Sequence, residues 1–492
     1  MNAMKYVLSV DQSTQGTKAL LFDEQGVLLN RADLPHRQII NDAGWVSHDP
    51  EEIYQNLLKT VKMVTEKANV SPDEIACMGI SNQRETSVAW DKTTGKPICD
   101  AIVWQCARAV DVCKDVEKTG IGDTVRERTG IPISPYFPAS KFAWFLRNVP
   151  EAKTLADKHQ LCLGTIDAWL VYKLTGAYRT DYSNASRTQL FNIHTLFWDA
   201  DVCAAFGIDP NDLPEVTDSD AVFGETDLGG MLKQTIPVCG VLGDSHAALF
   251  GQGCLNKGMT KATYGTGSSI MMNIGPEAVA SQNGLVTSLA WKRRGQVNYV
   301  LEGNLNYTGA VISWLKNDVG LIASAGETEA MALAANPADT AMLVPAFTGL
   351  GAPYWMGDAK ALLCGMTRLT GKNEIVRAAL DCIALQVRDV VAAMEKDCGA
   401  KVPVLRVDGG PTRNNYLMQF QSDMLNAMVS CPDAEELSGI GAAYMAGQSA
   451  GIFTDDVFQN LTYRNYAPTM PTQQWEGKLD SWRQAIRMIS IR

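Results

Sequence analysis

Residues 11–18 combine a carboxylate, a run of hydroxyls, a glycine and a lysine in one short turn between two apolar segments. Such a turn suits a polyphosphate and its metal ion. Backbone N–H groups and the hydroxyls of Ser13 and Thr14 can bond phosphate oxygens. Lys18 can neutralise charge, and Asp11 can hold Mg²⁺ directly or through water. An ordinary polar hairpin turn explains these residues equally well when they are considered alone.

A second polar turn of the same kind lies at residues 263–269, and Gly265 and Thr266 are its candidate phosphate ligands. An apolar strand is expected on each side of both turns. Further strands follow in each case, at 27–29 after the first turn and in a strand–turn–strand unit at 285–301 after the second. Two phosphate-type hairpins in two halves of one chain predict a nucleotide held between two related domains.

Asp244 follows an apolar stretch, residues 236–242, and a single turn residue, Gly243. A helix is expected directly after it, over residues 245–250. An α/β sheet places catalytic groups at such positions, because ligands bind in the crevice at the carboxyl ends of the strands. The alternative is that Asp244 only caps the helix that follows it.

Strands and helices alternate along the chain, so the sequence predicts an α/β fold. One helix is expected after Asp49, which can cap it, with Pro50 in the first turn and Glu52 completing a capping box. A longer helix is expected over about 373–396 from its apolar periodicity. A third, over 439–450, is rich in Gly and Ala, which allow a helix to approach a sheet or a ligand closely.

The chain has 492 residues, which is enough for two large domains or three small ones. It contains no long linker or low-complexity segment, so the domain boundary has to be inferred from the repeated hairpin architecture. We expect an N-terminal domain over residues 1–252, which holds the first polar turn and Asp244, and a C-terminal domain over residues 253–492, which holds the second polar turn.

The composition disfavours several classes of protein. A net charge of −11 and the lack of a Lys/Arg-rich run argue against a nucleic-acid binder. No apolar stretch is long enough to cross a membrane, and we expect no signal peptide. The 12 cysteines are scattered without metal-ligand spacing, which indicates reduced thiols in a cytoplasmic protein. Residues 365–372 look like a P-loop but have five residues, not four, between the glycines.

Several segments of the chain resemble the FGGY family of carbohydrate kinases, and within it the glycerol kinases most closely. The similarity extends over essentially the whole length. The segments that carry it are 11–14, 79–86, 102–106, 136–144, 164–170, 180–188, 344–355 and 406–410. The resemblance implies two actin-like (ribonuclease-H-like) domains that flank a cleft for nucleotide and substrate. It also implies phosphorylation of a terminal hydroxyl of a small polyol or sugar, with ATP and Mg²⁺.

The resemblance assigns roles on the acceptor side of this cleft. Asp244 becomes the general base that phosphoryl transfer to an alcohol needs. Arg84 and Glu85 would grip two neighbouring hydroxyls, although an Arg–Glu doublet is usually a surface ion pair. Trp104 and Tyr136 would form an apolar wall for the carbon chain, although buried aromatic residues are more often plain core.

On the nucleotide side, the resemblance places Gly410 and Asn414 against the adenine or ribose and Gly309 near the phosphates. Backbone approaches a ligand closely only where no Cβ intrudes, which is the physical reason for glycine at such positions. A simple turn is the alternative explanation.

Three positions differ from the family pattern, and the resemblance implies that two of them, Ser245 and Ser269, touch the polyol. Ser245 stands where glycerol kinases have Gln, Ser269 stands where they have Phe, and Ala107 replaces an Arg beside the Trp104 segment. Smaller side chains at the wall of the acceptor site leave room for a longer acceptor. We therefore expect a four- or five-carbon polyol or ketose, of the xylulose, ribulose, erythritol or ribitol type, to be preferred over glycerol. Residues 231–235 lack the Gly and Arg of the fructose-bisphosphate loop of some bacterial glycerol kinases, so that regulation is not implied.

Two interpretations from other classes stay open. One is a non-catalytic actin-like ATP-binding protein, since a fold does not fix a function, and it would need no Asp244 together with Arg84 and Glu85. The other is a phosphatase or ATPase on the same fold, which would release its product without a polyol. A homodimer and a homotetramer are both left open.

Overall fold

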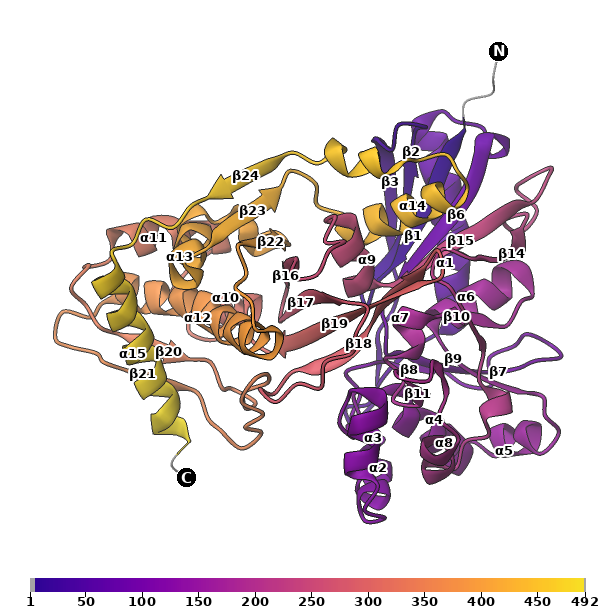
Figure 1. Ribbon diagram of the computed structural model, residues 1–492, viewed down its shortest axis with the longest axis horizontal. Coiled ribbons are helices and arrows are strands. Elements are labelled where there is room, and N and C mark those ends of the chain that lie inside the picture. The colour runs from indigo at the N-terminus through magenta and orange to yellow at the C-terminus, as the bar shows by residue number, and fades with distance from the viewer. Residues whose placement is uncertain (1–4, 491–492) are drawn as a thin grey trace.

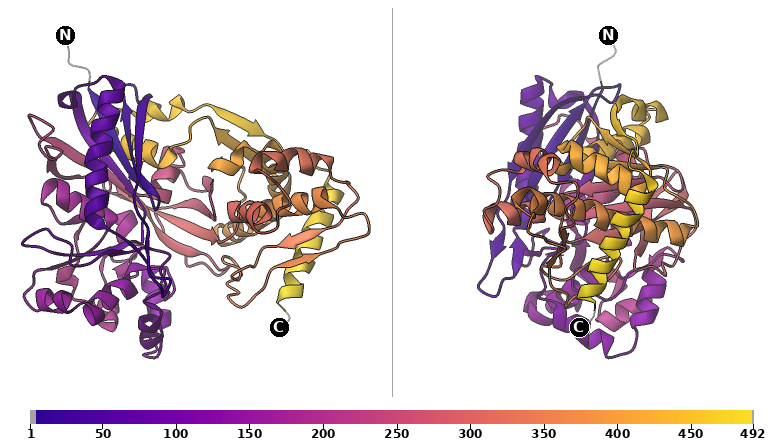
Figure 2. Two further views of the ribbon diagram at one scale, coloured as in Figure 1. Left: turned by 180° about the vertical axis from the view of Figure 1, so that it is seen from behind. Right: turned by 90° about the vertical axis from the view of Figure 1, so that its left-hand side faces the viewer.

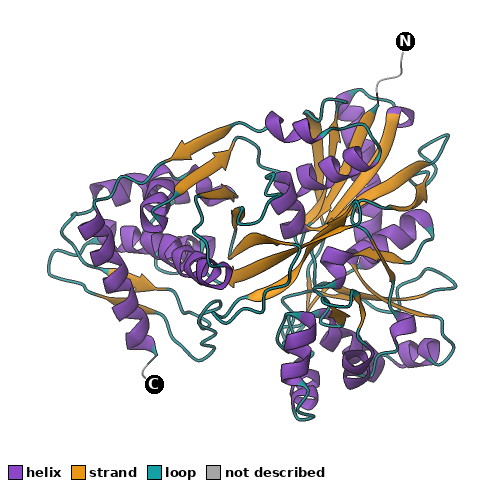
Figure 3. Ribbon diagram, in the orientation of Figure 1, coloured by secondary structure: helices purple, strands orange, loops and turns teal. Residues whose placement is uncertain are grey.

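The computed structural model describes residues 5–490 and contains two large mixed sheets that lie side by side, each accompanied by helices (Figures 1 and 3). The strand order is β14-β15-β6-β1-β2-β3 in the first sheet and β18-β19-β17-β16-β22-β23-β24 in the second. No helix in this range is long and apolar enough to cross a membrane. The predicted α/β class is confirmed.

The first sheet brings two candidate carboxylates to one edge. Its strands are β1 (Tyr6–Gln12), β2 (Gly16–Phe22), β3 (Leu28–Pro35), β6 (Ile75–Asn82), β14 (Val222–Thr226) and β15 (Ile236–Gly243). β1 and β2 form the predicted hairpin. β1, β6 and β15 run parallel, with Asp11, Ser81 and Leu242 in register at their carboxyl ends. Asp244, directly after β15, therefore lies at the same edge as Asp11.

The second sheet repeats this pairing. Its strands are β16 (Thr260–Tyr264), β17 (Ser268–Gly275), β18 (Val286–Arg293), β19 (Gln296–Leu305), β22 (Val404–Asp408), β23 (Met428–Pro432) and β24 (Tyr463–Tyr466). β16 pairs antiparallel with β17 and parallel with β22, as β1 does with β2 and β6. The predicted repeat of architecture is therefore present at the level of strand pairing, and it places the second polar turn at an equivalent position.

One face of the first sheet is covered by α14 (Leu437–Ser449), which also packs against α9 (Asp244–Gly251) (Figure 1). A side chain at Gly441 would collide with the carbonyl oxygen of Ala247, so the two helix backbones touch. Close packing was the predicted reason for the small residues here. The Ser438 hydroxyl also donates to the carbonyl oxygen of the first residue of α9, at 3.1 Å. The contact thus fixes the helix that carries the candidate base.

The opposite face of the first sheet is covered by α1 (Pro50–Ala68) and α6 (Ile166–Thr175), whose apolar residues share a core with β1 and β2 (Figure 2). Asp49 caps α1 as predicted, because its carboxylate accepts two backbone N–H groups of the first turn. The expected capping box is wrong. The Glu52 carboxylate accepts hydrogen bonds from the backbone N–H and Nε of Arg37 instead.

A smaller sheet, ordered β4-β5-β8-β7-β9, supports the segments expected to bind the acceptor. Its strands are β4 (Ile39–Ile40), β5 (Val46–His48), β7 (Ser87–Asp91), β8 (Ala101–Ile102) and β9 (Leu161–Thr165). Arg84 and Glu85 lie in the connection from β6 to β7. Trp104 follows β8, and Tyr136 precedes α4 (Pro138–Asn148). The small sheet thus holds these side chains beside the edge at which β1, β6 and β15 end.

Helices α10 to α13 and α15 accompany the second sheet. They are α10 (Gly309–Asn317), α11 (Thr328–Ala334), α12 (Lys372–Cys398), α13 (Asn415–Leu425) and α15 (Thr472–Ile489). α12 matches the helix expected over about 373–396, with one apolar side in the core against β17 and β19. Because α14 returns to the first sheet, the division of the chain between residues 252 and 253 stays a prediction.

Candidate active site

A cavity of about 850 Å³ lies between the two large sheets and is lined by residues of both. The predicted site residues that line it are Thr14, Arg84, Glu85, Trp104, Tyr136, Asp244, Ser245, Gly265, Thr266 and Ser269. The remaining predicted residues lie outside this lining: Asp11, Ser13, Lys18, Gly309, Gly410 and Asn414. The cavity therefore joins the acceptor-side candidates to parts of both phosphate-type turns.

Arg84 is a buried residue in the lining of the cavity, and it contacts carboxylates from both halves of the molecule. Its Nη1 and Nη2 donate to the two carboxylate oxygens of Glu302, on β19, at 3.0 and 2.8 Å. Its Nε lies 3.3 Å from Asp244 Oδ1 and 3.6 Å from Glu85 Oε1. The alternative that Arg84 belongs to a surface ion pair is wrong, because Arg84 is only 4% exposed.

Arg187 completes what we call the charged cluster, which consists of Arg84, Glu85, Arg187, Asp244 and Glu302. Arg187 Nε donates to Glu85 Oε1 at 2.7 Å. Its Nη1 lies 2.8 Å from Glu302 Oε2, in an ion pair whose angle is not that of a hydrogen bond. Two guanidinium groups face three carboxylates, so the cluster has one net negative charge when all are ionised. Such pairing offsets the high cost of burying isolated charges.

Asp244 is the most accessible carboxylate of the charged cluster, with a side chain that is 37% exposed. It is the first residue of α9, and Gly243 is the N-cap, so helix capping does not explain Asp244. Desolvation raises the pKa of Asp244, and the Arg84 charge opposes this effect. A carboxylate with a raised pKa beside a cavity is well suited to accept a proton from an alcohol.

The two aromatic candidates pack edge to face, with ring centroids 5.5 Å apart for Trp104 and Tyr136. Trp104 Nε1 donates to Thr14 Oγ1 at 2.9 Å, which joins the acceptor wall directly to the first phosphate-type turn. Lys141 Nζ donates to the carbonyl oxygens of Pro135 and Tyr136 at 2.7 and 2.5 Å and so fixes the segment before α4.

The first phosphate-type turn holds Asp11 nearly buried, with its Oδ1 accepting from the Ser81 hydroxyl at 2.9 Å. Burial raises the pKa of Asp11 to about 6, and Lys18 opposes this shift. The Lys18 ammonium pairs with Glu436 at 2.6 Å, and the Ser13 hydroxyl donates to the carbonyl oxygen of Gly16 at 3.0 Å. Both candidate phosphate ligands thus have partners within the protein.

The second phosphate-type turn is closed by backbone bonds. Gly265 N–H donates to Gly267 O at 2.8 Å, and Gly309 N–H donates to Gly265 O at 2.9 Å. A Cβ at Gly309 would lie only 2.6 Å from that same carbonyl oxygen, so close approach of α10 to the turn requires glycine.

The two candidates for the nucleoside lie outside this turn. The Asn414 side chain caps α13 by accepting a hydrogen bond from Leu417 N–H at 2.9 Å. Gly410 lies in the turn that follows β22.

Sequence patterns alone did not reveal several buried polar residues behind the cavity. Lys261 Nζ donates to the Thr263 hydroxyl at 2.9 Å, and burial lowers the pKa of Lys261. Gln252 Nε2 donates to Asp408 Oδ2 at 2.9 Å, and burial raises the pKa of Asp408. Of the missed residues, Arg187 and Asp408 lay in recognised segments, 180–188 and 406–410. A charged residue at the end of an apolar strand is a weak signal until its partner is known.

The chemistry of the donor groups fits Mg²⁺ at the first turn. No group of three or more His, Cys, Asp or Glu side chains suited to a metal occurs among residues 5–490. Mg²⁺ does not need one, because it is usually bound by one or two carboxylates together with phosphate oxygens and water. Asp11 supplies one buried carboxylate, and it is close enough to Asp244 for their charges to interact.

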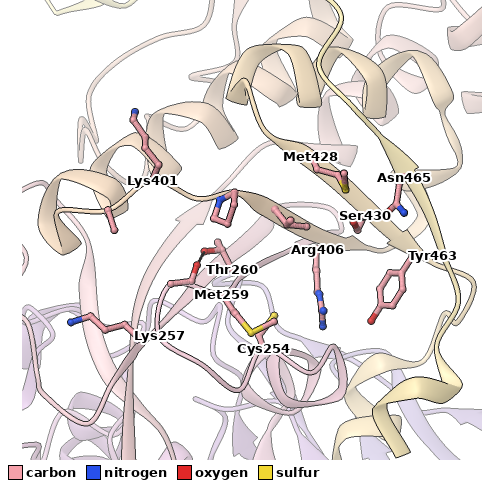
Figure 4. Close-up of a pocket in the computed structure, with 14 residues that line it drawn as sticks. Cys254, Lys257, Met259, Thr260, Lys401, Arg406, Met428, Ser430, Tyr463 and Asn465 are labelled. Carbon is pink, nitrogen blue, oxygen red and sulfur yellow. Dashed lines mark hydrogen bonds between the residues drawn. The ribbon is translucent and has the colours of Figure 1, made fainter. Parts of the chain in front are cut away.

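A second cavity, of about 540 Å³, lies at the opposite ends of β16 and β22 and contains none of the predicted site residues (Figure 4). The side chains of Lys257 and Lys401 point away from Arg406 and Tyr463 (Figure 4). Lys401 pairs with Glu395 at 2.9 Å, and the Arg406 guanidinium lies 5.2 Å from the Tyr463 ring centroid. Its cations do not converge on one point, so this cavity suits phosphate chemistry less well than the first.

Comparisons with known proteins agree with the interpretation of the first cavity. The model of the N-terminal domain of the FGGY family of carbohydrate kinases matches residues 6–251, and that of the C-terminal domain matches residues 260–450. Glycerol kinase 1 of Thermotoga maritima is 46% identical over 98% of this chain and 99% of its own. Glycerol kinase of Brevibacillus brevis is 45% identical over 98% and 97%.

Solved structures give the same result. Plasmodium falciparum glycerol kinase with ADP superposes with a TM-score of 0.94 at 35% identity, covering 99% of both chains. Xylulose kinase from Lactobacillus acidophilus superposes with a TM-score of 0.88 at 20% identity, covering 98% of this chain and 97% of its own. The second comparison is evidence for the fold alone.

Proposed function

Because the chain belongs to the FGGY family of carbohydrate kinases and is an ATP-dependent, glycerol kinase-like phosphotransferase, we propose that it phosphorylates a terminal hydroxyl of a small polyol or ketose with Asp244 as general base. The observation that carries this proposal is the set of residues that line one cavity. Arg84, Glu85 and Asp244 lie in the same cavity as Thr14 and Thr266. An acceptor hydroxyl and a nucleotide phosphate can therefore meet there.

In the proposed reaction the acceptor oxygen attacks the γ-phosphorus of ATP while its proton passes to Asp244. The bond from the γ-phosphorus to the oxygen that bridges to the β-phosphate breaks, and ADP leaves. Arg84 and Glu85 bind neighbouring hydroxyls, one as donor and one as acceptor, while Trp104 and Tyr136 contact the carbon chain. Positioning and charge stabilisation supply most of the catalysis in such transfers.

The nucleotide is proposed to bind along the two phosphate-type turns. Ser13, Thr14 and Lys18 from the first turn and Gly265 and Thr266 from the second would face the phosphates. Gly309 would lie near the phosphates, with Gly410 and Asn414 against the nucleoside. Asp11 would hold Mg²⁺, which neutralises phosphate charge when bound. The ion pair of Lys18 with Glu436 would have to open for Lys18 to act in this way.

We propose that the acceptor has four or five carbons. Ser245 and Ser269 both line the cavity with small side chains. The Ser269 hydroxyl donates to Glu302 at 3.0 Å, and Asn304 is its partner across β17 and β19. Asn304 and Asn306 also line the cavity. This wall is both short and polar, so extra hydroxyls of a longer acceptor would find partners that glycerol does not reach.

A panel of acceptors tests this proposal. We expect kcat/KM for at least one of erythritol, ribitol, xylulose and ribulose to exceed that for glycerol in an ADP-release assay. Ser269→Phe fills the space and should shift preference back toward glycerol, by roughly 10–200-fold in the ratio of kcat/KM values. The control is Ser269→Ala, which removes the hydroxyl without filling the space. A wild-type enzyme for which glycerol is clearly the best acceptor would refute the longer substrate.

The same assay separates the kinase from the other two classes. ADP release that needs no polyol would indicate an ATPase or phosphatase. ATP binding without turnover for any acceptor would indicate a non-catalytic ATP-binding protein.

A cytoplasmic location also belongs to the proposal, and the free state of all 12 cysteines supports it. A choice between homodimer and homotetramer can be tested by light scattering.

A further inference from the structure

Glu302 is fully buried behind the residues that line the cavity, at 0% exposure, on β19 of the second sheet. Both of its carboxylate oxygens accept hydrogen bonds from Arg84, and it forms an ion pair with Arg187. It also accepts a hydrogen bond from the Ser269 hydroxyl. Arg84 and Arg187 come from segments around the first sheet, so Glu302 joins the two halves of the molecule at the acceptor site. A fully buried carboxylate with two guanidinium partners is costly to maintain unless it serves a purpose.

We propose that Glu302 is a positioning residue for phosphoryl transfer, which holds the guanidinium of Arg84 in the orientation that serves Asp244 and the acceptor hydroxyl. The inference rests on the proposed function, since it assumes that Asp244 is the base. Glu302 itself is not expected to touch the substrate.

The geometry of arginine explains how Glu302 can act through Arg84. A guanidinium is planar and carries five N–H donors in a fixed fork. Glu302 engages one donor on each Nη. The Nε–H and the second proton of each Nη remain, and Nε lies 3.3 Å from Asp244 Oδ1. Fixing two donors of a rigid group fixes the direction of the other three.

Charge balance gives Glu302 a second role. The charged cluster has two guanidinium groups and three carboxylates, and Asp244 is its most exposed carboxylate. Without the Glu302 charge, Arg84 and Arg187 would be matched only by Glu85 and Asp244. Arg84 would then pair more tightly with Asp244, which would make the carboxylate a weaker base. Glu302 therefore leaves Asp244 free to accept a proton.

This argument predicts a direction for the pH dependence. The charges of Arg84, Glu85 and Lys261 interact with that of Asp244, as does the charge of Asp11 on β1. Arg187, His246 and Lys261 interact electrostatically with Glu302. Removing one negative charge from this set lowers the pKa of Asp244. The acid limb of the kcat/KM profile reports that pKa, so it should move to lower pH.

The test uses Glu302→Gln and Glu302→Asp in the full-length enzyme, with glycerol and ribitol as acceptors. We expect kcat to fall by roughly 10–10²-fold in Glu302→Gln, as misplacement of a substrate-orienting group does elsewhere. The acceptor KM should rise, the ATP KM should change little, and the acid limb should move to lower pH. Glu302→Asp retains the charge on a shorter side chain, so it should fold, lose less kcat and keep the wild-type acid limb.

The matched control is Glu374→Gln. Glu374 is also buried, but it accepts from the backbone N–H groups of Asn336 and Gly371, and none of these three residues lines the cavity. It should keep wild-type kinetics. Melting temperatures of all variants are measured first. If Glu302→Gln does not fold, the inference is judged from Glu302→Asp. A kcat below that of the wild type supports it, and an unchanged kcat contradicts it.

Folded Glu302 variants with wild-type kcat, acceptor KM and acid limb would overturn the inference. That outcome is distinguishable from failure of the proposed function, which is tested by Asp244→Asn in parallel. If Asp244→Asn is inactive and the Glu302 variants are normal, only the positioning role of Glu302 is refuted. A normally active Asp244→Asn removes the base on which the inference rests.

Discussion

Replacing Asp244 by Asn is expected to lower kcat by about 10²–10⁴-fold, because positioned proton transfer to a side chain contributes a factor of this size. Asn retains the shape and the acceptor oxygen that now bonds Ser245 N–H at 2.6 Å, but it cannot take a proton from the acceptor. The measurement is the initial rate of ADP release at saturating ATP and acceptor, together with ATP affinity by calorimetry, which should be unchanged.

Asp212→Asn is the matched control for this experiment. Asp212 is a buried aspartate with a pKa raised to about 6, but it lies in a short 3₁₀ helix (Pro210–Asp212) and does not line the cavity. It should keep the wild-type rate. If Asp244→Asn also works at a near-normal rate, Asp244 has no part in proton transfer, and another base must be sought.

Replacing Asp11 by Asn is expected to lower kcat/KM for MgATP by roughly 10²-fold or more, because a metal ion that neutralises phosphate charge contributes several kcal/mol to the transition state. The half-saturating Mg²⁺ concentration should rise as well. Both are measured by titrating Mg²⁺ at fixed ATP. The Ser81 hydroxyl, which donates to Asp11 Oδ1, can donate equally well to the amide oxygen of the variant, so the fold should be retained.

Asp11 also predicts a pH dependence of metal binding. Burial raises the pKa of its carboxyl to about 6. Above that pH the carboxylate is ionised and available to the cation, and below it a proton competes. Apparent Mg²⁺ affinity should therefore level off well above pH 6 and fall as the pH drops through about 6 in the wild type. The Asp11→Asn variant should lose this dependence.

The control for Asp11 is Asp23→Asn, in the turn at the other end of β2. Asp23 Oδ1 accepts from Gln25 and Val27 N–H, and Asn can accept the same bonds. Its Mg²⁺ titration should match that of the wild type. Identical Mg²⁺ titrations for Asp11→Asn and Asp23→Asn would place the metal elsewhere.

Local pattern predicted the elements because each depends on residues close in sequence. The hairpin around residues 11–18, the capped start of α1 and the helix α12 follow from apolar periodicity and turn residues, which act over a few positions. The capping box failed at Glu52, since a partner distant in sequence, Arg37, competes for its carboxylate. A pattern of neighbouring residues does not contain that competition.

Apart from Asp244, which its position after an apolar strand also indicated, the acceptor candidates came from resemblance to a family rather than from periodicity. Arg84, Glu85, Trp104, Tyr136 and Asp244 are separated by up to 160 positions in the sequence, yet they line one cavity. Parallel strands whose carboxyl ends share one edge explain why Arg84, Glu85 and Asp244 meet. For Asp11 and Asp244 this convergence could be anticipated from the strands before them. For Trp104 and Tyr136, in irregular connections, it could not.

The sequence by itself determined the α/β class, the two polar turns and the position of Asp244 after a strand, because these depend on short-range order. The tertiary structure alone decided the partners of the charges. Glu302 reaches Arg84 across 218 positions, and Lys18 reaches Glu436 across 418. Ser269, expected to open space, proved to be bound to Glu302. Which buried charges face one another depends on how two sheets pack, and packing is a property of the whole chain that no local pattern records.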